Sequence, residues 1–290
     1  MKKIIFWCVA GLGVVVLSGF FYVTRVVDLR TPELKKGITK QIEAKGRSLL
    51  MSSLKIMGGW ERWKAFRKKM LRVQFKDTWK EGLMTSLFVP AHLSGRQLEL
   101  VFRPDTESGR LRFLEGKRKG TQWGVQHWLT YTADAKGTLS WKQDDNIKFY
   151  IPTYRYFMFM PFYLMDAKLI AYAGQRTLRG KTFDLVFATW GTYAPQKKVD
   201  QYLLWIERST KRVVYAQYTI RDIMPSFIGA SKASRFKRVH GFLLPHQWII
   251  FDKIEQEEKW MHKMTYQTFI DAPEIPSSYV FPEPKRMGTK

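Results

Sequence analysis

Four strand-length apolar runs in the second half of the chain constrain its fold more than any other feature. They cover residues 182–190, 199–208, 213–220 and 243–251. Each is rich in Val, Ile, Phe, Tyr and Trp, which suit a pleated, half-buried surface. Short turn-like pieces such as residues 209–212 separate them. Because a parallel crossover needs a dozen or more residues, such short connections join antiparallel neighbours. The pattern therefore predicts an antiparallel meander.

The same two-residue alternation appears in the first half of the chain. It is clearest over residues 71–80, and residues 98–102 repeat it. We expect one face to be buried (Leu71, Val73, Phe75, Leu98, Leu100, Phe102) and the other to be exposed (Arg72, Lys76, Arg103). Further strands are predicted at residues 110–113, 122–131, 171–178, 229–239 and 258–270. Trp123, Val125, Leu129 and Tyr131 should share one side of the 122–131 strand.

The chain is strongly basic, with 49 Lys and Arg against 25 acidic residues and a formal net charge of +24 over 290 residues. Lys and Arg recur on the polar face of successive predicted strands, as in an antiparallel sheet with one solvated face. Much of the charge is then solvated exterior. Because no nucleic-acid-binding module accompanies it, we predict no nucleic-acid partner.

The N-terminus combines Lys2 and Lys3 with a mostly apolar run over residues 4–24. As a helix this run is about 30 Å long, enough to span a bilayer. An uncleaved anchor would place a single-pass protein in the inner membrane with its domain facing the periplasm. The alternative is a cleaved signal peptide and a secreted or periplasmic protein. The apolar run continues through residues 20–23 with no small-x-small site, which favours the anchor.

The remaining organisation follows from composition. Residues 1–25 form the predicted membrane anchor, 26–57 an amphipathic helical segment interrupted at Gly46, and 58–271 the sheet domain. Gly58-Gly59 should end the helix, and residues 60–67 should form a second one. Residues 272–290, with four prolines, are expected to be an extended C-terminal tail.

Residues 154–165 are unusual, since ten of the twelve are Phe, Tyr, Met or Leu. A segment that is apolar all round is either buried or faces something apolar other than the core. Pro161 predicts a short helix or a loop. A buried plug is the ordinary interpretation. The hypothesis carried forward is that this stretch covers a ligand, with Phe157, Phe159, Met160, Phe162, Tyr163, Leu71, Val73 and Phe75 as the ligand-binding residues.

Catalytic signatures are absent from the sequence. It contains no Gly-x-Ser-x-Gly elbow, Walker loop, dinucleotide fingerprint or His-Glu-x-x-His, and its five histidines are scattered singly. The only cysteine, Cys8, lies in the apolar N-terminal run, which excludes an internal disulfide framework. We therefore expect a non-enzymatic protein with no catalytic residue, metal ligand or cofactor. A hydrolase acting on an apolar substrate is a distant alternative.

Two motifs carry a family resemblance. Residues 57–63 (MGGWERW), and residues 200–206 (DQYLLWI) with the turn that follows, resemble the LolA/LolB-like lipoprotein-carrier superfamily, which includes outer-membrane lipoprotein-sorting-like domains. The similarity extends over roughly residues 40 to 270. It implies an α+β fold in which a curved antiparallel sheet, an unclosed half-barrel covered by helices, holds acyl chains. It implies no catalytic residues.

This chain departs from those carriers by its predicted transmembrane helix, since the carriers are soluble or lipidated. The expected function is a membrane-anchored extracytoplasmic domain that binds lipid or the acyl chains of a lipoprotein. Its expected partners are the membrane and that ligand, and the sequence identifies no protein partner. The alternative is an envelope scaffold or assembly protein with no ligand.

Overall fold

The computed structural model describes residues 25–80, 90 and 93–282. The predicted anchor at residues 4–24, together with Cys8, lies outside these residues. In the part of the chain that is described, no helix has the length and apolar content needed to cross a membrane.

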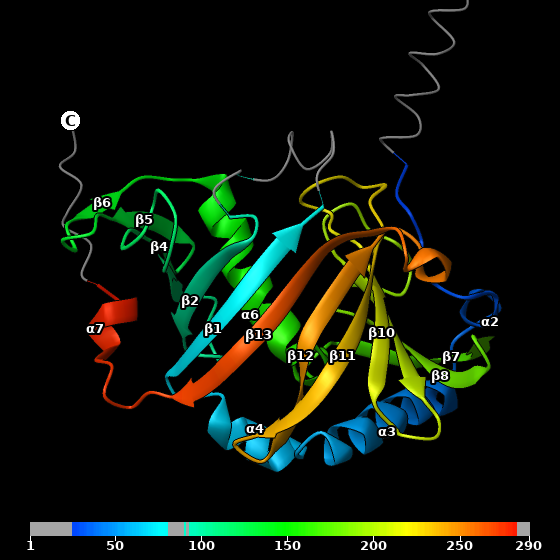
Figure 1. Cartoon of the computed structure of the whole chain (residues 1–290). Helices are drawn as coiled ribbons and strands as arrows, with labels where there is room; N and C mark the ends of the chain where they lie inside the picture. The colour runs from blue at the N-terminus through cyan, green and yellow to red at the C-terminus, as the bar shows by residue number, and fades with distance from the viewer. Residues whose placement is uncertain (1–24, 81–89, 91–92, 283–290) are drawn as a thin grey trace, which may run out of the picture. The chain divides into compact units, whose positions relative to one another are not determined.

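The described strands form a large antiparallel sheet with the hydrogen-bonded order β6-β5-β4-β3-β2-β1-β13-β12-β11-β10-β9-β8-β7 (Figure 1). Its two end strands, β6 and β7, are not neighbours in this order, so the sheet is unclosed. Most neighbours in the order are also neighbours in sequence, as the meander predicts. The strands are β1 (Leu71–Trp79), β2 (Arg96–Phe102), β3 (Gly109–Phe113), β4 (Gln122–Gln126), β5 (Leu129–Ala133), β6 (Leu139–Trp141), β7 (Leu169–Leu178), β8 (Lys181–Thr189), β9 (Gln201–Glu207), β10 (Val213–Tyr218), β11 (Gly229–Val239), β12 (Phe242–Phe251) and β13 (Trp260–Asp271).

The described part of the chain contains few helices. They are α2 (Pro32–Lys35), α3 (Lys40–Ile56), α4 (Trp60–Phe66), α6 (Asp145–Met165) and α7 (Ser277–Val280), with a short 3-10 turn at Ile254–Gln256. The chain divides into two compact units. Unit 1 comprises Met1–Leu50, Leu164–Ala230 and Asp252–Glu255, and contains β7 to β10. Unit 2 comprises Met51–Tyr163, Ser231–Phe251 and Gln256–Lys290, and contains the other strands, α4, α6 and α7.

The predicted faces of the first two strands are confirmed. All six residues expected inside are at most 1% exposed. On the opposite face Lys76 is exposed, whereas Arg72 and Arg103 are half-exposed because each pairs with a nearby carboxylate, that of Glu274 and Asp105 respectively. Strand β1 lies between β2 and β13 and pairs with both over its whole length or nearly so, which makes it central to unit 2.

The predicted single strand over residues 122–131 is wrong. The structure has a hairpin in which Gln126 of β4 pairs with Leu129 of β5. His127 and Trp128 form its turn, and both have positive φ (47° and 64°), as a type I′ turn requires. Neither is Asn or Gly, so the usual sequence signal of this turn is missing. Leu129 is consequently 40% exposed and does not share a buried side with Tyr131.

Two helical predictions are also corrected. The segment before Gly58 is not one helix, since α2 ends near Gly37 (φ 143°) and α3 begins at Lys40. Gly46 lies inside α3 and does not interrupt it. The predicted stop at Gly58-Gly59 is confirmed, because both glycines have positive φ at the end of α3. The second helix is confirmed as α4.

The stretch at 154–165 is helical over a longer range than expected. It is the second half of α6, which starts at Asp145 and continues through Pro152 and Pro161. Phe159 (φ −130°, ψ 21°) is not helical, so two helical pieces meet there in a kink. A proline removes one backbone donor and crowds the preceding turn, which places the kink just before Pro161 without ending the helix.

The C-terminal segment is not wholly extended either. Residues 277–280 form α7, where Val280 is fully buried and packs with Met70 and Val101. The apolar side chains in this Pro-rich segment thus have a place in the core of unit 2, which a composition argument does not reveal.

Candidate functional site

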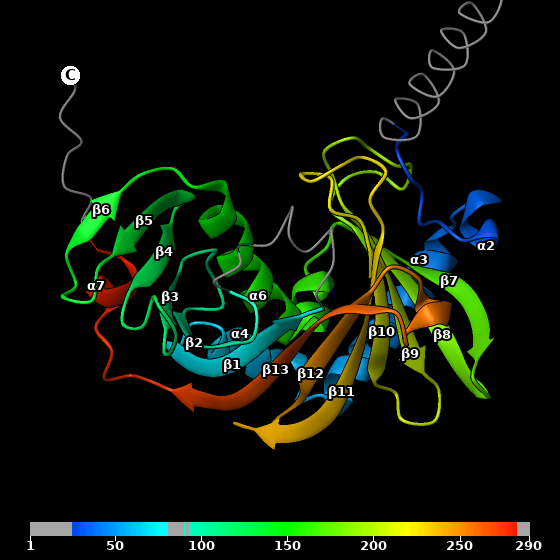
Figure 2. The same ribbon diagram turned by 45° about the horizontal axis from the view of Figure 1, so that its top comes forward.

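The eight residues predicted to bind a ligand all lie in unit 2, and the structure brings them into one layer. Leu71, Val73 and Phe75 project from β1, and the other five come from the kinked part of α6. Seven of the eight are buried, and Tyr163 is half-buried. Helix α6 lies against one face of β1 and β13 in both views (Figures 1 and 2).

Aromatic contacts join α6 to four neighbouring strands. Tyr154 lies 4.8 Å from Phe75 of β1, and Phe157 lies 5.6 Å from Trp248 of β12, measured between ring centroids. Phe159, at the kink, lies 6.4 Å from both Phe102 of β2 and Phe269 of β13. These separations and tilted ring planes are typical of packed aromatic pairs. The apolar face of the sheet and the apolar helix therefore cover each other.

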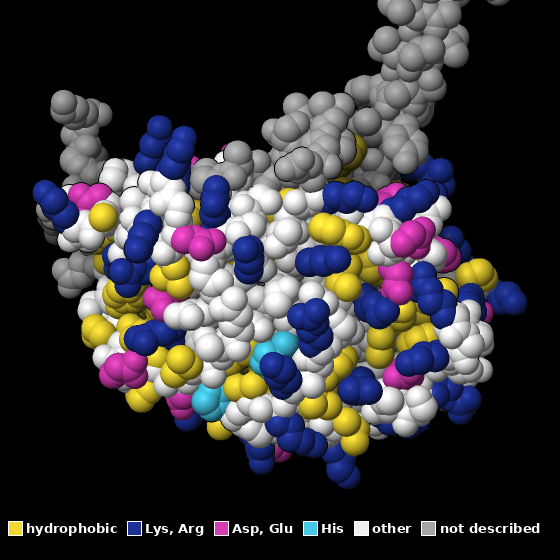
Figure 3. Space-filling view, viewed as in Figure 1, with side chains coloured by type: hydrophobic (Ala, Val, Ile, Leu, Met, Phe, Trp, Pro, Cys, Tyr) yellow, Lys and Arg dark blue, Asp and Glu magenta, His cyan; other side chains and the backbone are white. Residues whose placement is uncertain are grey.

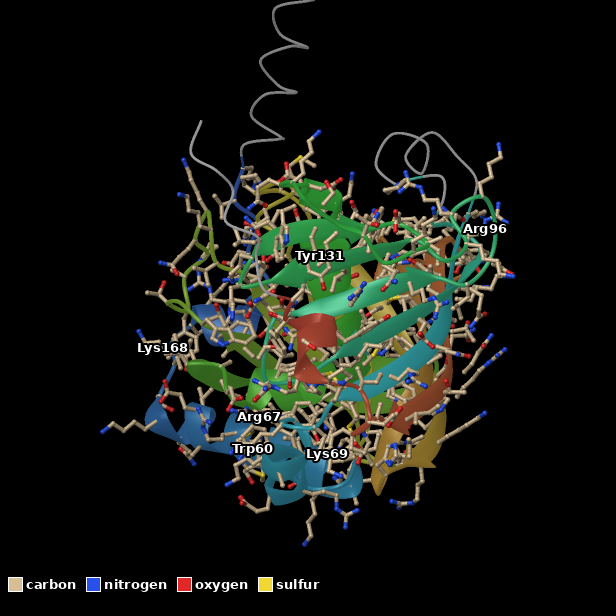
Figure 4. The ribbon with its side chains drawn as sticks, turned by 90° about the vertical axis from the view of Figure 1, so that its left-hand side faces the viewer. Trp60, Arg67, Lys69, Arg96, Tyr131 and Lys168 are labelled. Carbon is tan, nitrogen blue, oxygen red and sulfur yellow. The ribbon has the colours of Figure 1, made fainter. Side chains whose placement is uncertain are left out.

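Helix α4 closes the same layer at one end. The ring of Trp63, which is fully buried, lies 4.9 Å from Phe159 and 5.0 Å from Phe162. Phe242 of β12 also packs on Trp63 and on Phe162. The labelled residues Trp60, Arg67 and Lys69 mark the α4 end of the unit, and Tyr131 marks β5 (Figure 4). Trp63 of α4 thus packs against the kinked part of α6.

Two indole nitrogens in this layer have no hydrogen-bond acceptor among the described residues. They are Nε1 of Trp63 and Nε1 of Trp248, and both side chains are at most 1% exposed. An indole N–H can only donate, and a buried donor without an acceptor costs about 1–3 kcal/mol. Both lie beside predicted ligand-binding residues, Phe162 and Phe157 respectively. The layer is therefore apolar but carries two donors available to a carbonyl oxygen.

Tyr163 has a different environment from the rest of the predicted set. Its hydroxyl donates to the carbonyl oxygen of Pro104 at 2.9 Å, and Arg155 donates to the Tyr163 hydroxyl at 2.9 Å. Burial raises the pKa of Tyr163 to about 12, against the opposing effect of Arg155, so it remains a neutral donor. These bonds fix the last turns of α6 to the loop after β2.

The polar centre of the site is Asp77, which the sequence analysis did not select. Asp77 follows Phe75 on β1 with the two-residue period, so its parity places it on the apolar face. It is indeed fully buried. The two-residue spacing from Phe75 was therefore the sequence signal that Asp77 is buried. A buried carboxylate on an otherwise apolar strand face needs hydrogen-bond partners.

Asp77 accepts three side-chain hydrogen bonds. Its Oδ2 accepts one from the Tyr154 hydroxyl at 2.9 Å and one from Trp79 Nε1 at 2.8 Å. Its Oδ1 lies 2.8 Å from Nδ1 of His262 on β13. Burial, and next the negative charge of Asp77, raise the pKa of Tyr154 far above its ordinary value. Tyr154 therefore donates at all ordinary pH values.

His262 is held on two sides. Its ring stacks on the indole of Trp79 with 3.7 Å between centroids and 2° between planes. Because ionised Asp77 can only accept, Nδ1 of His262 carries the proton in this bond, and in the neutral ring Nε2 is then an acceptor. No described residue is hydrogen-bonded to Nε2. No Ser, Thr or Cys side chain among the described residues is hydrogen-bonded to the pair.

The outer face of β1 and β13 is basic, and the described residues contain no metal-type cluster. Where β1 and β13 present their outer face, Lys and Arg are interspersed with polar and acidic side chains and do not gather into one patch (Figure 3). Within residues 25–80, 90 and 93–282, no three His, Cys, Asp or Glu side chains are grouped as metal ligands would be. The site is therefore an apolar layer with one buried polar cluster.

No family model matches the sequence. No curated protein matches it either. Among solved structures, a DUF1329 family protein from Desulfovibrio piger is similar with a TM-score of 0.50 and 10% identity, over 82% of this chain and 97% of that one. The chain shares its fold with that protein.

Two further similar structures carry the name that the sequence resemblance suggests. A LolA superfamily protein from Nitrosomonas europaea has a TM-score of 0.49 at 9% identity, over 81% of this chain and 96% of that one. A putative outer membrane lipoprotein-sorting protein domain from Vibrio parahaemolyticus has a TM-score of 0.48 at 10% identity, with the same coverage. Both names belong to the superfamily that residues 57–63 and 200–206 resemble.

Proposed function

We propose that the chain binds a lipid, or the acyl chains of a lipoprotein, on the apolar face of unit 2 beneath α6, in the manner of a half-barrel. The observation that carries this proposal is the pair of buried indole donors, Trp63 Nε1 and Trp248 Nε1, in a layer otherwise made of aromatic and Met side chains. In a segment that only fills the core, buried N–H donors without acceptors would lower stability and bring no compensating benefit. An ester or amide carbonyl of a lipid would accept from them while its chain stays among apolar groups.

The kink in α6 provides a route for the ligand. Phe159 departs from helical geometry, and Pro152 and Pro161 each lack a backbone N–H. Helix α6 therefore has fewer backbone hydrogen bonds of its own and depends more on its contacts with the sheet. Movement about Phe159 would separate the aromatic layer from β1 and β13 without unfolding the sheet. The Met and Phe side chains of α6 adapt readily to a flexible chain.

The test is a paired measurement on F157A, F159A and F162A in the full chain held in a lipid-free amphipol. If these rings are only core, each substitution destabilises the protein by about 3–5 kcal/mol and leaves the affinity of the folded fraction unchanged. We expect a smaller loss in thermal stability together with weaker binding of a fluorescent fatty-acid probe, because a ligand-lining site tolerates variable filling.

The control is F183A. Phe183 is a buried ring of unit 1 that packs on Trp205 and Tyr215, and none of these three residues belongs to the proposed layer. It should lower stability by the full core amount and leave probe affinity unchanged. Large stability losses with unchanged affinity in all three α6 variants would reduce α6 to a plug and leave an envelope scaffold without ligand as the better function.

We also propose that residues 4–24 remain attached as a single inner-membrane anchor, with the domain facing the periplasm. The chain that follows them is part of unit 1. Arg221 donates to the carbonyl oxygen of Val27 at 2.6 Å, Leu29 N–H donates to Gln201 at 2.9 Å, and Thr31 donates to Ala173 at 2.8 Å. Such a short, fixed connection would hold the domain near the bilayer, where its basic residues meet anionic head groups.

N-terminal sequencing of the membrane-extracted protein tests the anchor. We expect a sequence that starts at or next to Met1, because no small-x-small site follows the apolar run. A mature N-terminus beyond Gly19 would show that the segment is a cleaved signal. The domain would then be periplasmic or secreted, and the lipid-binding proposal would stand or fall separately.

A further inference from the structure

The apolar face of unit 2 changes character along β1. From Leu71 to Phe75 the inward residues are apolar, and then Asp77 and Trp79 follow in the same parity. Trp79 pairs directly with His262 in the β1–β13 register, and Asp77 pairs with Met264. The layer thus has an apolar tract and one polar end. That is the arrangement a lipid with a small polar head would match.

We propose that His262, held by Asp77, is the head-group contact of this layer and takes a neutral lipid that carries a hydroxyl or amide N–H donor, such as a monoacylglycerol. This inference rests on the proposed lipid binding and adds the chemical class of the ligand. It is based on which hydrogen-bond donors and acceptors around Asp77 are already paired.

All three side-chain donors in the cluster are directed at Asp77. Trp79 Nε1, the Tyr154 hydroxyl and His262 Nδ1 each bond to one of its oxygens. His262 Nε2 is then an acceptor that no described residue meets with a donor. The side chain of His262 is 12% exposed, whereas that of Asp77 is fully buried. The imidazole is therefore partly accessible, whereas the carboxylate is not.

The ring is also preorganised. Stacking on Trp79 and the bond to Asp77 fix both its plane and its tautomer. A ligand donor that binds Nε2 therefore does not have to order the side chain first, which reduces the cost of binding.

The charge of the cluster selects against acidic heads. The Asp77 carboxylate bonds to the same imidazole, and a phosphate or carboxylate at Nε2 would face it through a low-dielectric interior. A neutral hydroxyl or amide meets no such repulsion. A purely structural role, in which the cluster only ties β1 to β13 and α6, predicts no dependence on the head group.

The experiment compares head groups on one acyl chain with the full chain in lipid-free amphipol. Monooleoylglycerol, methyl oleate and oleate compete with a fluorescent fatty-acid probe. We expect monooleoylglycerol to bind about 3- to 10-fold more tightly than methyl oleate, the effect of one added hydrogen bond, and more tightly than oleate. The variant H262N keeps an N–H for Asp77 but places no acceptor at the Nε2 position, so the preference for monooleoylglycerol should disappear.

The matched control is H246N. His246 is a buried histidine on β12 whose Nδ1 lies 3.3 Å from the carbonyl oxygen of Leu244, outside the cluster. This variant should keep the preference. An equal preference in the unmodified chain and in H262N, or tighter binding of oleate, would overturn the inference while leaving lipid binding intact. Failure of every ligand to displace the probe would overturn the proposed function and this inference together.

A second measurement does not depend on the variant folding. In the unmodified chain, the Nε2 nitrogen resonance of His262 should shift on addition of monooleoylglycerol, and that of His246 should not. A His262 resonance that stays unchanged while the ligand displaces the probe would contradict the proposed contact.

Discussion

The D77A variant is expected to lose about 3–5 kcal/mol of unfolding free energy, the largest effect of any single polar substitution proposed for this chain. The Trp79 indole, the Tyr154 hydroxyl and the His262 imidazole all donate to Asp77 in a buried site. Alanine would leave these donors without an acceptor, and each unsatisfied buried donor costs about 1–3 kcal/mol. Partial relaxation of the three side chains keeps the total below the simple sum.

The measurement is the denaturant midpoint of the full chain, followed by Trp fluorescence. The matched control is D271A on β13, because Asp271 forms a partly exposed ion pair with Lys69. Such surface pairs contribute about 0–1 kcal/mol, so the control should differ little from the unmodified chain. A D77A midpoint as close to the unmodified one as that of D271A would mean that water replaces the carboxylate, and the cluster would not be the buried centre described above.

The second large effect is expected at Gly46, where helix propensity and tertiary contacts predict opposite changes in stability for substitution by alanine. Helix propensity alone predicts that G46A stabilises α3 by about 1 kcal/mol. In the structure, however, a Cβ at this position would lie 2.3 Å from the carbonyl carbon of Ala171 and 2.4 Å from the nitrogen of Tyr172. These are backbone atoms of β7, which cannot move aside as a flexible side chain would.

We therefore expect G46A to destabilise unit 1 by about 1–3 kcal/mol, the usual cost of overpacking, and G46V by more. The control is S48A, at an exposed position of the same helix, which should be neutral or slightly stabilising. Thermal melting of the three variants decides the sign. Stabilisation by G46A would mean that α3 and β7 are not in close contact.

The candidate site was predictable only in part. The period-two pattern identified Leu71, Val73 and Phe75, and the apolar density of residues 154–165 identified the α6 residues that contact their layer. Both signals are local. The contact of Phe157 with Trp248 and the bonds of Tyr154 and His262 to Asp77 join residues 77 to 185 positions apart. No local pattern encodes such contacts. The parity of Asp77 with Phe75 was a local signal of its burial, but Asp77 was not among the predicted residues.

Turn geometry shows the same limit. His127 and Trp128 adopt positive φ without the Asn or Gly that normally signals such a turn. The pairing of β4 with β5 imposes that conformation, so the sequence reads as one strand where the chain makes a hairpin. The kink of α6 is an intermediate case, since Pro161 marks its place but not the continuation of the helix on both sides.

The sequence by itself determined the antiparallel sheet, the inward face of β1 and β2, the stop at Gly58-Gly59 and the excess of solvated positive charge, because alternation, glycine conformation and charge act over a few neighbouring residues. Only the tertiary structure decided that Gly46 is a point of contact with β7, that Val280 belongs to a core, and that Asp77 orients His262. Those roles depend on which distant backbone or donor comes within a few ångströms, and packing sets that distance.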